Sequence, residues 1–483
     1  MRTVLFYLTV FWVISSAVAA DRQPNIVIIL ADDLGWNDVS YHGGEIATPH
    51  IDQLAHEGVE LNRFYVAPIC SPTRSGLMTG RYPVRFGLMR STVTPWGTFG
   101  LSKEEELLPE VLAAAGYRHR AIIGKWHLGH GARKFHPLSR GFSFFYGHYN
   151  GAVDYFTHYR EGELDWHRNF KADYTTGYTT DLCADEAVLF IETHADDGPF
   201  FLYVPFNAPH GPHQAKPEDL RKYAHLTGRT MPEKAPGTYA SQGRGKNARQ
   251  TLAAMISAMD DGIGRILATL EKQGIAGNTL VLFSSDNGGS VQVADNSPLR
   301  GGKDTVFEGG IRVPAAIRWP DELTGGRRLD APLSYIDILP TLRRILDIDA
   351  PPRNPLDGID CLDILRGREE APARKMFSYT AQYGEEKESL SVMTPDWKLV
   401  RLGPNILRDD EASRAGAELL LFRITEDPFE QRNLADRHPD IVRDLLREIA
   451  GFRALEPENT VRPYLEGKEG FQAPPEWRFP DTH

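Results

Sequence analysis

The stretch Asn25–Leu30 (NIVIIL), followed by Ala31 and the pair Asp32-Asp33, decides the fold class of this chain. An apolar run rich in β-branched residues is typical of a strand that is buried on both faces, as the strands of parallel sheets are. The run stops abruptly at two acidic side chains. It therefore predicts a central strand whose carboxyl end carries polar groups.

The same organisation recurs along the chain. Apolar strands are predicted over residues 119–123, 200–206 and 279–283, and they lead into the polar sequences GKWH (124–127), NAPH (207–210) and SDNG (285–288). Helices are predicted over residues 48–54, 108–115 and 248–273. This alternation predicts an α/β domain, residues 21–370, with a mostly parallel central sheet flanked by helices. Ligands of such sheets collect at the carboxyl ends of the strands, where these polar sequences lie.

Both ends of the chain differ from this pattern. Residues 1–20 combine Arg2, an apolar run over 4–14 and an A-x-A site, which is typical of a cleaved secretory signal. The apolar run is short for a membrane span, so an uncleaved anchor is the less favoured alternative. We therefore expect an exported protein, periplasmic or secreted, without a membrane anchor.

After residue 370 the sequence changes character. A charged linker over 366–374 precedes expected strands over 375–379, 397–402 and 419–424 and an amphipathic helix over 439–452. These elements predict a smaller α+β domain, residues 371–483, with an antiparallel sheet that caps the first domain. The tail after the helix is expected to lie over the surface.

Charge and cysteine content exclude some classes of protein. The chain has 54 Lys and Arg against 65 Asp and Glu, a net charge of −11, which disfavours a nucleic-acid partner. An anionic substrate would need a local basic cleft. Three cysteines exclude a disulfide-dense scaffold. If Cys70 is modified, Cys183 and Cys361 could pair, but two buried thiols are favoured.

Four oxygen-bearing side chains follow two distant strands. Asp32 and Asp33 follow the first strand, and Asp286 and Asn287 follow the strand over 279–283. Carboxylate and amide oxygens suit a hard divalent cation such as Ca²⁺ or Mg²⁺ rather than zinc. The alternative is that these residues cap helices or lie in a solvated loop. The two clusters together favour a metal site.

The segment Cys70-Ser71-Pro72-Thr73-Arg74, followed by SGLMTGR (75–81), carries the strongest motif. By itself Cys70 could be a small buried apolar residue. The segment resembles the C-x-P-x-R signature of type I sulfatases, and the resemblance extends from about residue 25 to the C-terminal helix. It implies an alkaline phosphatase-like fold and oxidation of Cys70 to formylglycine. The partner for that step would be a formylglycine-generating or anaerobic sulfatase-maturating enzyme.

The resemblance also implies roles for individual residues. The metal ligands would be Asp32, Asp33, Cys70 after modification, Asp286 and Asn287. Arg74, Lys125 and Lys303 would offset the charge of the sulfate. Lys125 and His127 are two residues apart in GKWH, so they are expected on the same side of the chain. His127 would act as the base on the second hydroxyl of the aldehyde hydrate, and His210 would protonate the leaving alcohol.

The sequences RGF (140–142) and DYFTH (154–158) give the chain an arylsulfatase B-like character, which implies a sulfated carbohydrate substrate. The proposed substrate contacts are His148, Asn150, Asp154, His213 and Arg300. The many aromatic residues over 142–159 could instead belong to the core. Glycosaminoglycan and algal galactan both remain open as substrates. Two rival hypotheses are a phosphoester or phosphonate hydrolase on the same scaffold and a non-catalytic protein that binds sulfated glycans.

Overall fold

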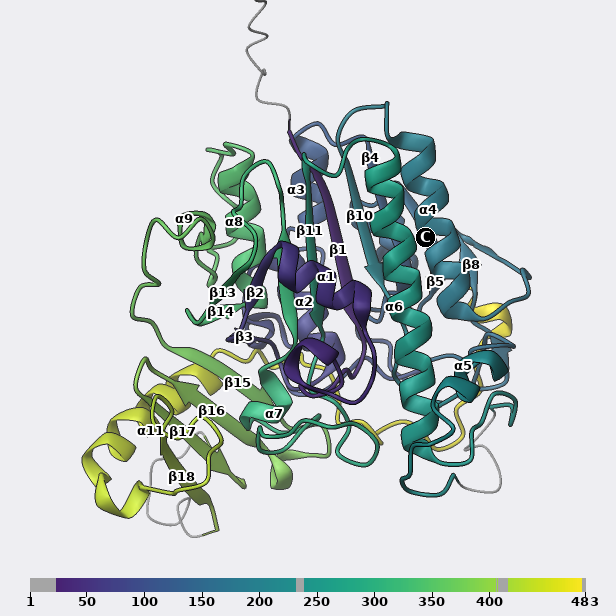
Figure 1. Cartoon of the computed structure of the whole chain (residues 1–483). Helices are drawn as coiled ribbons and strands as arrows, with labels where there is room; N and C mark the ends of the chain where they lie inside the picture. Colours follow the sequence, from purple (N-terminus) through teal and green to yellow (C-terminus); the bar gives the residue numbers. More distant parts are fainter. Residues whose placement is uncertain (1–22, 232–238, 405, 407–415, 480–483) are drawn as a thin grey trace, which may run out of the picture.

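A ten-stranded mixed sheet forms the centre of the molecule (Figure 1). The computed structural model of the chain describes residues 23–231, 239–404, 406 and 416–479, so the predicted signal over 1–20 lies outside the described residues. Within the described part, the order of strands in this sheet is β13 (Arg327–Leu329), β2 (Val59–Leu61), β12 (Ala315–Arg318), β11 (Thr279–Ser285), β1 (Asn25–Ala31), β10 (Phe200–Pro205), β4 (His119–Lys125), β5 (Phe144–His148), β8 (His167–Arg168) and β9 (Lys171–Ala172).

The middle of this sheet is parallel, as predicted. Strands β11, β1, β10, β4 and β5 all run the same way, and Ile28 of β1 pairs with Tyr203 of β10 and Leu282 of β11. Antiparallel pairs occur only toward the two edges, at β11–β12, β12–β2, β5–β8 and β8–β9. The sequence therefore predicted the fold class correctly.

The two faces of the sheet are covered by different helices. Alternate residues of β1 point to opposite faces, so Val27 and Ile29 belong to one apolar core and Ile26 and Ile28 to the other. The helices are α1 (Pro49–Glu57), α4 (Thr179–His194), α5 (Pro217–Lys222) and α6 (Ala248–Lys272) on the Val27 side, and α2 (Cys70–Thr79), α3 (Leu108–Ala114), α8 (Ile338–Ile345) and α9 (Leu362–Leu365) on the Ile26 side. In Figure 1 the first group lies in front of the sheet and α2 and α3 lie behind it.

A second, smaller sheet follows residue 370, in agreement with the prediction of an antiparallel sheet. Its four strands are β15 (Met376–Thr380), β16 (Ser389–Met393), β17 (Trp397–Leu402) and β18 (Glu418–Arg423), and α11 (Pro439–Arg453) packs against it. The domain boundary near 370 stays a prediction. Two further pairs of short strands are β3 (Phe64–Tyr65) with β14 (Leu333–Ser334), and β6 (Tyr159–Arg160) with β7 (Glu163–Leu164).

The C-terminal sheet is joined to the large sheet by a buried ion pair and by apolar contacts. Lys398 of β17 is fully buried, and its Nζ lies 2.8 Å from Glu308 of α7 (Glu308–Ile311) and 2.8 Å from Glu430. Tyr379 and Val392 of the small sheet belong to the same apolar core as Ile26 and Ile28. The small sheet therefore packs tightly against the large one.

The tail after α11 returns across the molecule and is anchored there. Trp477 is 2% exposed, and its indole nitrogen donates a hydrogen bond of 3.1 Å to the carbonyl oxygen of Arg160. The ring of His130 contacts the Trp477 ring edge-on. The tail thus crosses the surface, as expected from its sequence, and the buried side chain of Trp477 anchors it there.

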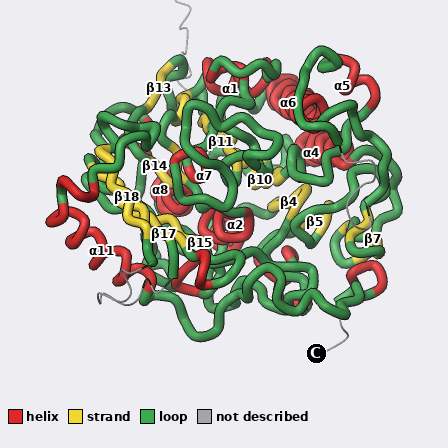
Figure 2. The backbone as a smooth tube through the Cα atoms, turned by 90° about the horizontal axis from the view of Figure 1, so that it is seen from below, coloured by secondary structure: helices red, strands yellow, loops and turns green. Residues whose placement is uncertain are grey.

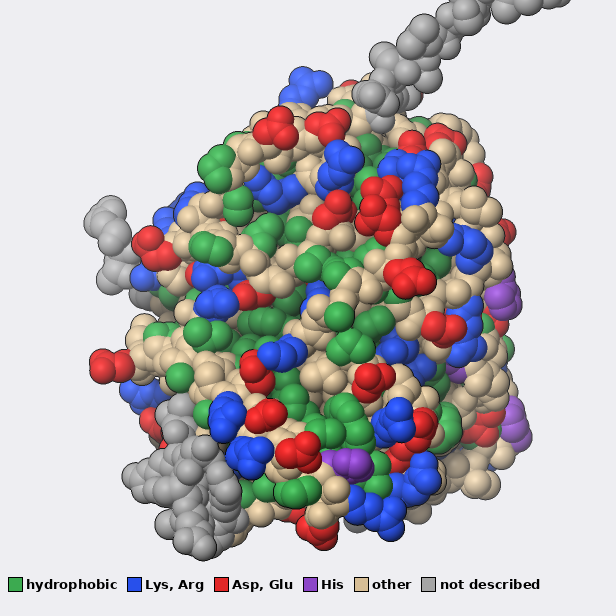
Figure 3. Space-filling view, turned by 90° about the vertical axis from the view of Figure 1, so that its left-hand side faces the viewer, with side chains coloured by type: hydrophobic (Ala, Val, Ile, Leu, Met, Phe, Trp, Pro, Cys, Tyr) green, Lys and Arg blue, Asp and Glu red, His purple; other side chains and the backbone are tan. Residues whose placement is uncertain are grey.

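The arrangement places the carboxyl ends of the parallel strands at one edge of the large sheet, the lower edge in Figure 1. Figure 2 views the molecule from that edge, where α2 lies beside the ends of β4 and β10. On the face shown in Figure 3, lysines and arginines are interspersed with acidic side chains and form no extended basic field. Among the described helices, none has the length and apolarity required to cross a membrane.

Candidate active site

The polar residues predicted at separate strand ends meet in one place. Asp32 and Asp33 follow β1, and Asp286 and Asn287 follow β11. The Asp33 amide donates to Asp286 Oδ1 at 3.2 Å, and Asn287 Nδ2 donates to Asp33 Oδ1 at 2.7 Å. Cys70, the first residue of α2, donates from Sγ to Asp32 Oδ1 at 3.4 Å. The parallel register of β1 and β11 thus creates this acidic cluster.

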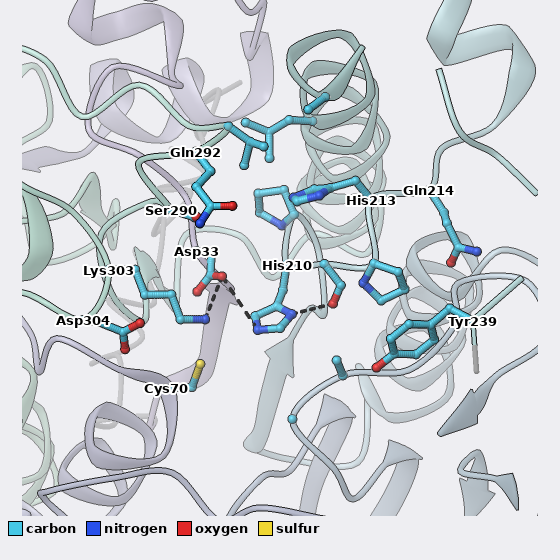
Figure 4. Close-up of a pocket in the computed structure, with 18 of the residues that line it drawn as sticks. Asp33, Cys70, His210, His213, Gln214, Tyr239, Ser290, Gln292, Lys303 and Asp304 are labelled. Carbon is cyan, nitrogen blue, oxygen red and sulfur yellow. Dashed lines mark hydrogen bonds and ion pairs between the residues drawn. The ribbon is translucent and has the colours of Figure 1, made fainter. Parts of the chain in front are cut away.

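Three cations surround the carboxylates. Arg74 is fully buried and donates from Nε and Nη2 to Asp286 Oδ2 at 3.1 and 2.7 Å. Lys125, the last residue of β4, lies 2.5 Å from Asp32 Oδ2, and Lys303 lies 2.8 Å from Asp33 Oδ2. Figure 4 shows Lys303 and His210 approaching Asp33 from two sides, with Cys70 nearby. Three cations thus balance three carboxylates at this point.

The cluster fits a hard divalent cation. Burial and the neighbouring carboxylate of Asp32 together raise the pKa of Asp286 to about 6, so a cation at this point would relieve the repulsion. Asn287 Oδ1 is buried and has no hydrogen-bond partner, which suits an oxygen that would ligate a metal. Ligand atoms of Asp32, Asp33, Cys70 and His210 all lie within 4.8 Å of one another.

Cys70 lies on the floor of the cavity but is a poor nucleophile as a thiol. It is 2% exposed, and burial raises the pKa of its thiol well above the usual range. Because the thiolate is the reactive form of cysteine, a buried protonated thiol would react slowly. The position suits chemistry at this atom only if the thiol is converted to another group.

His127 has the hydrogen-bond pattern of a neutral base. Its Nε2 lies 2.9 Å from the carbonyl oxygen of Val93, which can only accept, so Nε2 carries the proton. Nδ1 of His127 is buried without a hydrogen-bond partner. Burial, with the positive charge of Lys125 adding to it, lowers the pKa of His127 well below the usual range. The backbone of His127 has φ of 55°. Lys125 contacts Asp32, and His127 lines the cavity.

His210 has the opposite ring nitrogen protonated. Its Nδ1 donates to the carbonyl oxygen of Gly211 at 2.6 Å, and its Nε2 lies 3.7 Å from Asp33 Oδ2. Burial, with Lys303 adding to it, lowers the pKa of His210 well below the usual range. The Nε2 atom therefore lies beside the carboxylate cluster, where a ligand of that cluster would be within reach.

A cavity of about 560 Å³ opens onto this cluster. The predicted site residues that line it are Asp33, Cys70, His127, His210, His213 and Lys303. Asp32, Arg74, Lys125, Asp286 and Asn287 are fully buried behind these residues and are connected to them, directly or through one another, by the bonds described above. The predicted catalytic and metal-binding residues are thus brought together at one end of one cavity.

Three of the predicted substrate contacts lie in the protein interior. His148, Asn150 and Asp154 are fully buried and do not line the cavity. Asn150 Nδ2 donates to Asp165 at 2.8 Å. The carboxylate of Asp154 accepts four hydrogen bonds from the protein itself. These side chains are committed to internal contacts.

Arg300 also lies away from the cavity lining. Its Nη1 donates to the carbonyl oxygen of Glu430 at 3.0 Å, and its guanidinium lies over the Phe307 ring. This arginine therefore contacts the junction with the C-terminal sheet. His213 is the one predicted substrate contact that lines the cavity.

Other residues of the cavity wall were missed at the sequence level. Arg160 lies on the short strand β6 and the others come from loops, without periodicity or a motif to mark them. They are Arg160, Arg229, Tyr239, Arg244, Asp304, Tyr383 and Tyr464. Aromatic and basic residues predominate among them, whereas carboxylates and cations are equal in number at the floor.

Comparisons with known proteins agree with this geometry. The Sulfatase family model matches residues 24–348. Arylsulfatase J of Mus musculus is 33% identical over 480 residues, covering 90% of this chain and 77% of that protein. N-acetylgalactosamine-6-sulfatase of Mus musculus is 33% identical over 473 residues, covering 89% and 85%.

A solved structure extends the similarity to three dimensions. The crystal structure of Ps i-CgsB, also determined in complex with k-i-k-neocarrahexaose, has a TM-score of 0.80 and 29% identity, and the match covers 93% of this chain and 96% of that one. Family model, relatives and fold agree with the resemblance seen in the sequence. The chain belongs to the sulfatase family and is a sulfuric ester hydrolase.

Proposed function

We propose that this enzyme hydrolyses a sulfate ester on a sulfated carbohydrate, using a formylglycine formed from Cys70 and a divalent cation, Ca²⁺ or Mg²⁺. The observation that carries the proposal is the meeting of Cys70 with three carboxylates, three cations and two neutral histidines at one end of a cavity. A binding protein would not need two neutral imidazoles whose free nitrogens are held beside that cluster.

The ligands of the cation would be Asp32, Asp33, Asp286 and Asn287, together with the modified side chain at position 70. When bound, the cation would supply Lewis-acid polarisation of the sulfate and of the nucleophile. The hydrated aldehyde would supply one hydroxyl group as the nucleophile that takes up the sulfate. Loss of the proton from its second hydroxyl would then break the C–O bond to that sulfate, so that sulfate leaves and the aldehyde is regenerated.

The protein's own residues then divide the remaining work. Lys303 and Lys125 would hold the negatively charged sulfate oxygens, and Arg74 would hold Asp286 in place while adding positive charge. His210, once protonated at Nε2, would donate that proton to the leaving alcohol. His127 would accept a proton at Nδ1, its one free nitrogen.

The carbohydrate class is inferred from relatives and from the cavity. The relatives include a protein named for N-acetylgalactosamine 6-sulfate, and the similar solved structure holds a neocarrahexaose. A cavity of about 560 Å³ with an aromatic and basic wall suits a sugar ring better than a small inorganic ester. We also infer export to the periplasm or outside the cell, and a maturating enzyme as partner.

The test combines mass spectrometry with a matched pair of esters. The peptide containing position 70, from protein made with a maturating enzyme, should carry an aldehyde or its hydrate. The enzyme should hydrolyse 4-nitrophenyl sulfate at least 100-fold faster than the phosphate ester of the same alcohol. Cys70→Ala should abolish this activity, whereas Cys183→Ala, at another buried thiol, should retain it. Preference for the phosphate ester, or an intact thiol in active protein, would contradict the proposal.

A further inference from the structure

The wall of the cavity carries positive charge that the proposed reaction does not use. Arg160 lies on β6, Arg229 in the loop after α5, and Arg244 in the loop before α6, and all three line the cavity. The chain as a whole carries a net charge of −11. Three arginines in the lining of one cavity, separate from Arg74, Lys125 and Lys303 at the carboxylate cluster, therefore require their own explanation.

Arg244 is an unpaired cation on a fixed backbone. Its half-buried side chain makes no hydrogen bond or ion pair with the residues that the structure describes. The flanking residues are held firmly, because Gly243 accepts from the Ala215 amide at 2.7 Å and the Gly245 amide donates to Thr251 Oγ1 at 3.1 Å. The loop thus presents a guanidinium to the cavity without using it internally.

Arg160 is more deeply placed. It is 9% exposed, and its Nη1 donates to the hydroxyl of Tyr239. Its Nε is buried without a hydrogen-bond partner, although the carboxylate of Glu161 lies 3.4 Å away. Arg160 is thus a cation of the cavity lining that is held in place by Tyr239 and Glu161.

The position of Tyr239 depends on the interior. The next residue, Ala240, donates its amide to the buried carboxylate of Asp154 at 2.8 Å, and its carbonyl accepts from Gln214 at 2.9 Å. In Figure 4, Tyr239 lies on the far side of His210 from Lys303. Through its hydroxyl, Tyr239 connects Arg160 to the side of His210 that faces away from Lys303.

We propose that Arg160, Arg229 and Arg244 form a second anion-binding subsite, which recognises a sulfate or carboxylate group on the sugar next to the one that loses its sulfate. This inference rests on the proposed function and narrows its substrate class to oligosaccharides with more than one negative charge. Arg229 donates only a 3.4 Å hydrogen bond to Gln292 among its described side-chain contacts, so it too is available. Guanidinium groups suit the paired oxygens of sulfate and carboxylate.

The test measures binding rather than turnover, so it does not depend on the proposed chemistry. The Cys70→Ala protein is titrated calorimetrically with disaccharides of two series, one built on N-acetylgalactosamine 6-sulfate and one on galactose 4-sulfate. In each series the neighbouring sugar carries a sulfate, a carboxylate or only hydroxyl groups. In at least one series, a second anion should strengthen binding about tenfold, as expected for charge-assisted hydrogen bonds. Within that series, comparing the disaccharide with a neighbouring sulfate and the one with a neighbouring carboxylate shows which anion is preferred.

Adding Arg244→Gln should remove this gain while leaving the affinity for the neutral-neighbour disaccharide unchanged. Arg160→Gln should do the same, and Arg437→Gln, an exposed arginine far from the cavity lining, should retain the gain. The gain should also shrink with increasing salt concentration. Equal affinities across both series, or a gain that survives in the Arg160→Gln/Arg244→Gln double variant, would overturn the inference. Failure of the proposed function would appear separately, as absence of hydrolysis by matured wild-type enzyme.

Discussion

A substitution at Asp154 tests whether this residue contacts the substrate or supports the structure from the interior. The sequence suggested that it touches the substrate, whereas the structure gives its carboxylate four internal donors. Oδ1 accepts from the amides of Phe156 and Thr157 at 3.0 and 2.9 Å, and Oδ2 accepts from Gln214 Nε2 and the Ala240 amide, both at 2.8 Å. Asp154→Asn keeps the shape of the side chain and removes one acceptor atom.

The loss can be estimated from these bonds. The single amide oxygen of Asn can accept either from the amides of Phe156 and Thr157 or from Gln214 and the Ala240 amide. The other two donors would then face the NH₂ group of Asn, which cannot accept a hydrogen bond. Gln214 cannot turn its amide to compensate without losing the bond from the Tyr155 amide to its Oε1. Two charge-assisted hydrogen bonds at about 1.5–3 kcal/mol each predict a loss of about 3–6 kcal/mol in the free energy of unfolding.

Urea unfolding of Asp154→Asn and of Asp436→Asn, an exposed aspartate, would measure this difference. The control should stay within about 0.5 kcal/mol of the wild type. Because Asp154 also fixes Ala240 beside Tyr239, the variant should bind doubly anionic disaccharides more weakly and aryl sulfates normally. A variant with wild-type unfolding free energy and a raised KM for all substrates would refute this reasoning and restore a direct contact with substrate.

Four further outcomes are expected. Lys303→Ala should lower kcat/KM for sulfate esters by about 100-fold or more with a nearly unchanged melting temperature, since it removes charge stabilisation at the reaction centre; a tenth of wild-type activity or more would contradict this. Chelation should abolish activity and lower the melting temperature, both restored by Ca²⁺ or Mg²⁺, and a fully active chelated enzyme would disprove the metal site. Lys398→Met should lower the unfolding free energy by about 3–5 kcal/mol in urea, because it strands the buried carboxylates of Glu308 and Glu430; a loss below about 1 kcal/mol would argue against the buried pair. Burial lowers the pKa of His136 from 6.5 to about 3. Between these two pH values the unfolded chain binds a proton that the folded chain does not. The free energy of unfolding should therefore decrease as the pH is lowered from 6.5 to 3, by up to about 1.4 kcal/mol per pH unit. His136→Gln should reduce that slope in unfolding measurements at pH 4.5, 5.5 and 6.5, and an unchanged slope would contradict the buried neutral state.

The floor of the site could be predicted from the sequence because each of its residues adjoins a recognisable strand or motif. Asp32 and Asp286 follow apolar runs whose parallel pairing fixes their proximity, and Cys70 begins a helix marked by its own signature. Local geometry was harder to predict. Nothing in GKWH reveals the φ of 55° at His127.

The wall could not be predicted, for a physical reason that also bears on specificity. Arg160, Arg229 and Arg244 come from a short strand and two loops, and the segments around them are held by contacts such as that of Asp154 with Ala240, which joins residues 86 positions apart. No periodicity or spacing records such contacts. The shared motifs of the floor identify the reaction, whereas these loops contribute the groups that would meet the rest of the sugar chain. Membership of the family therefore says little about which oligosaccharide is desulfated, and substitutions in the wall should change that choice without changing the chemistry of ester hydrolysis.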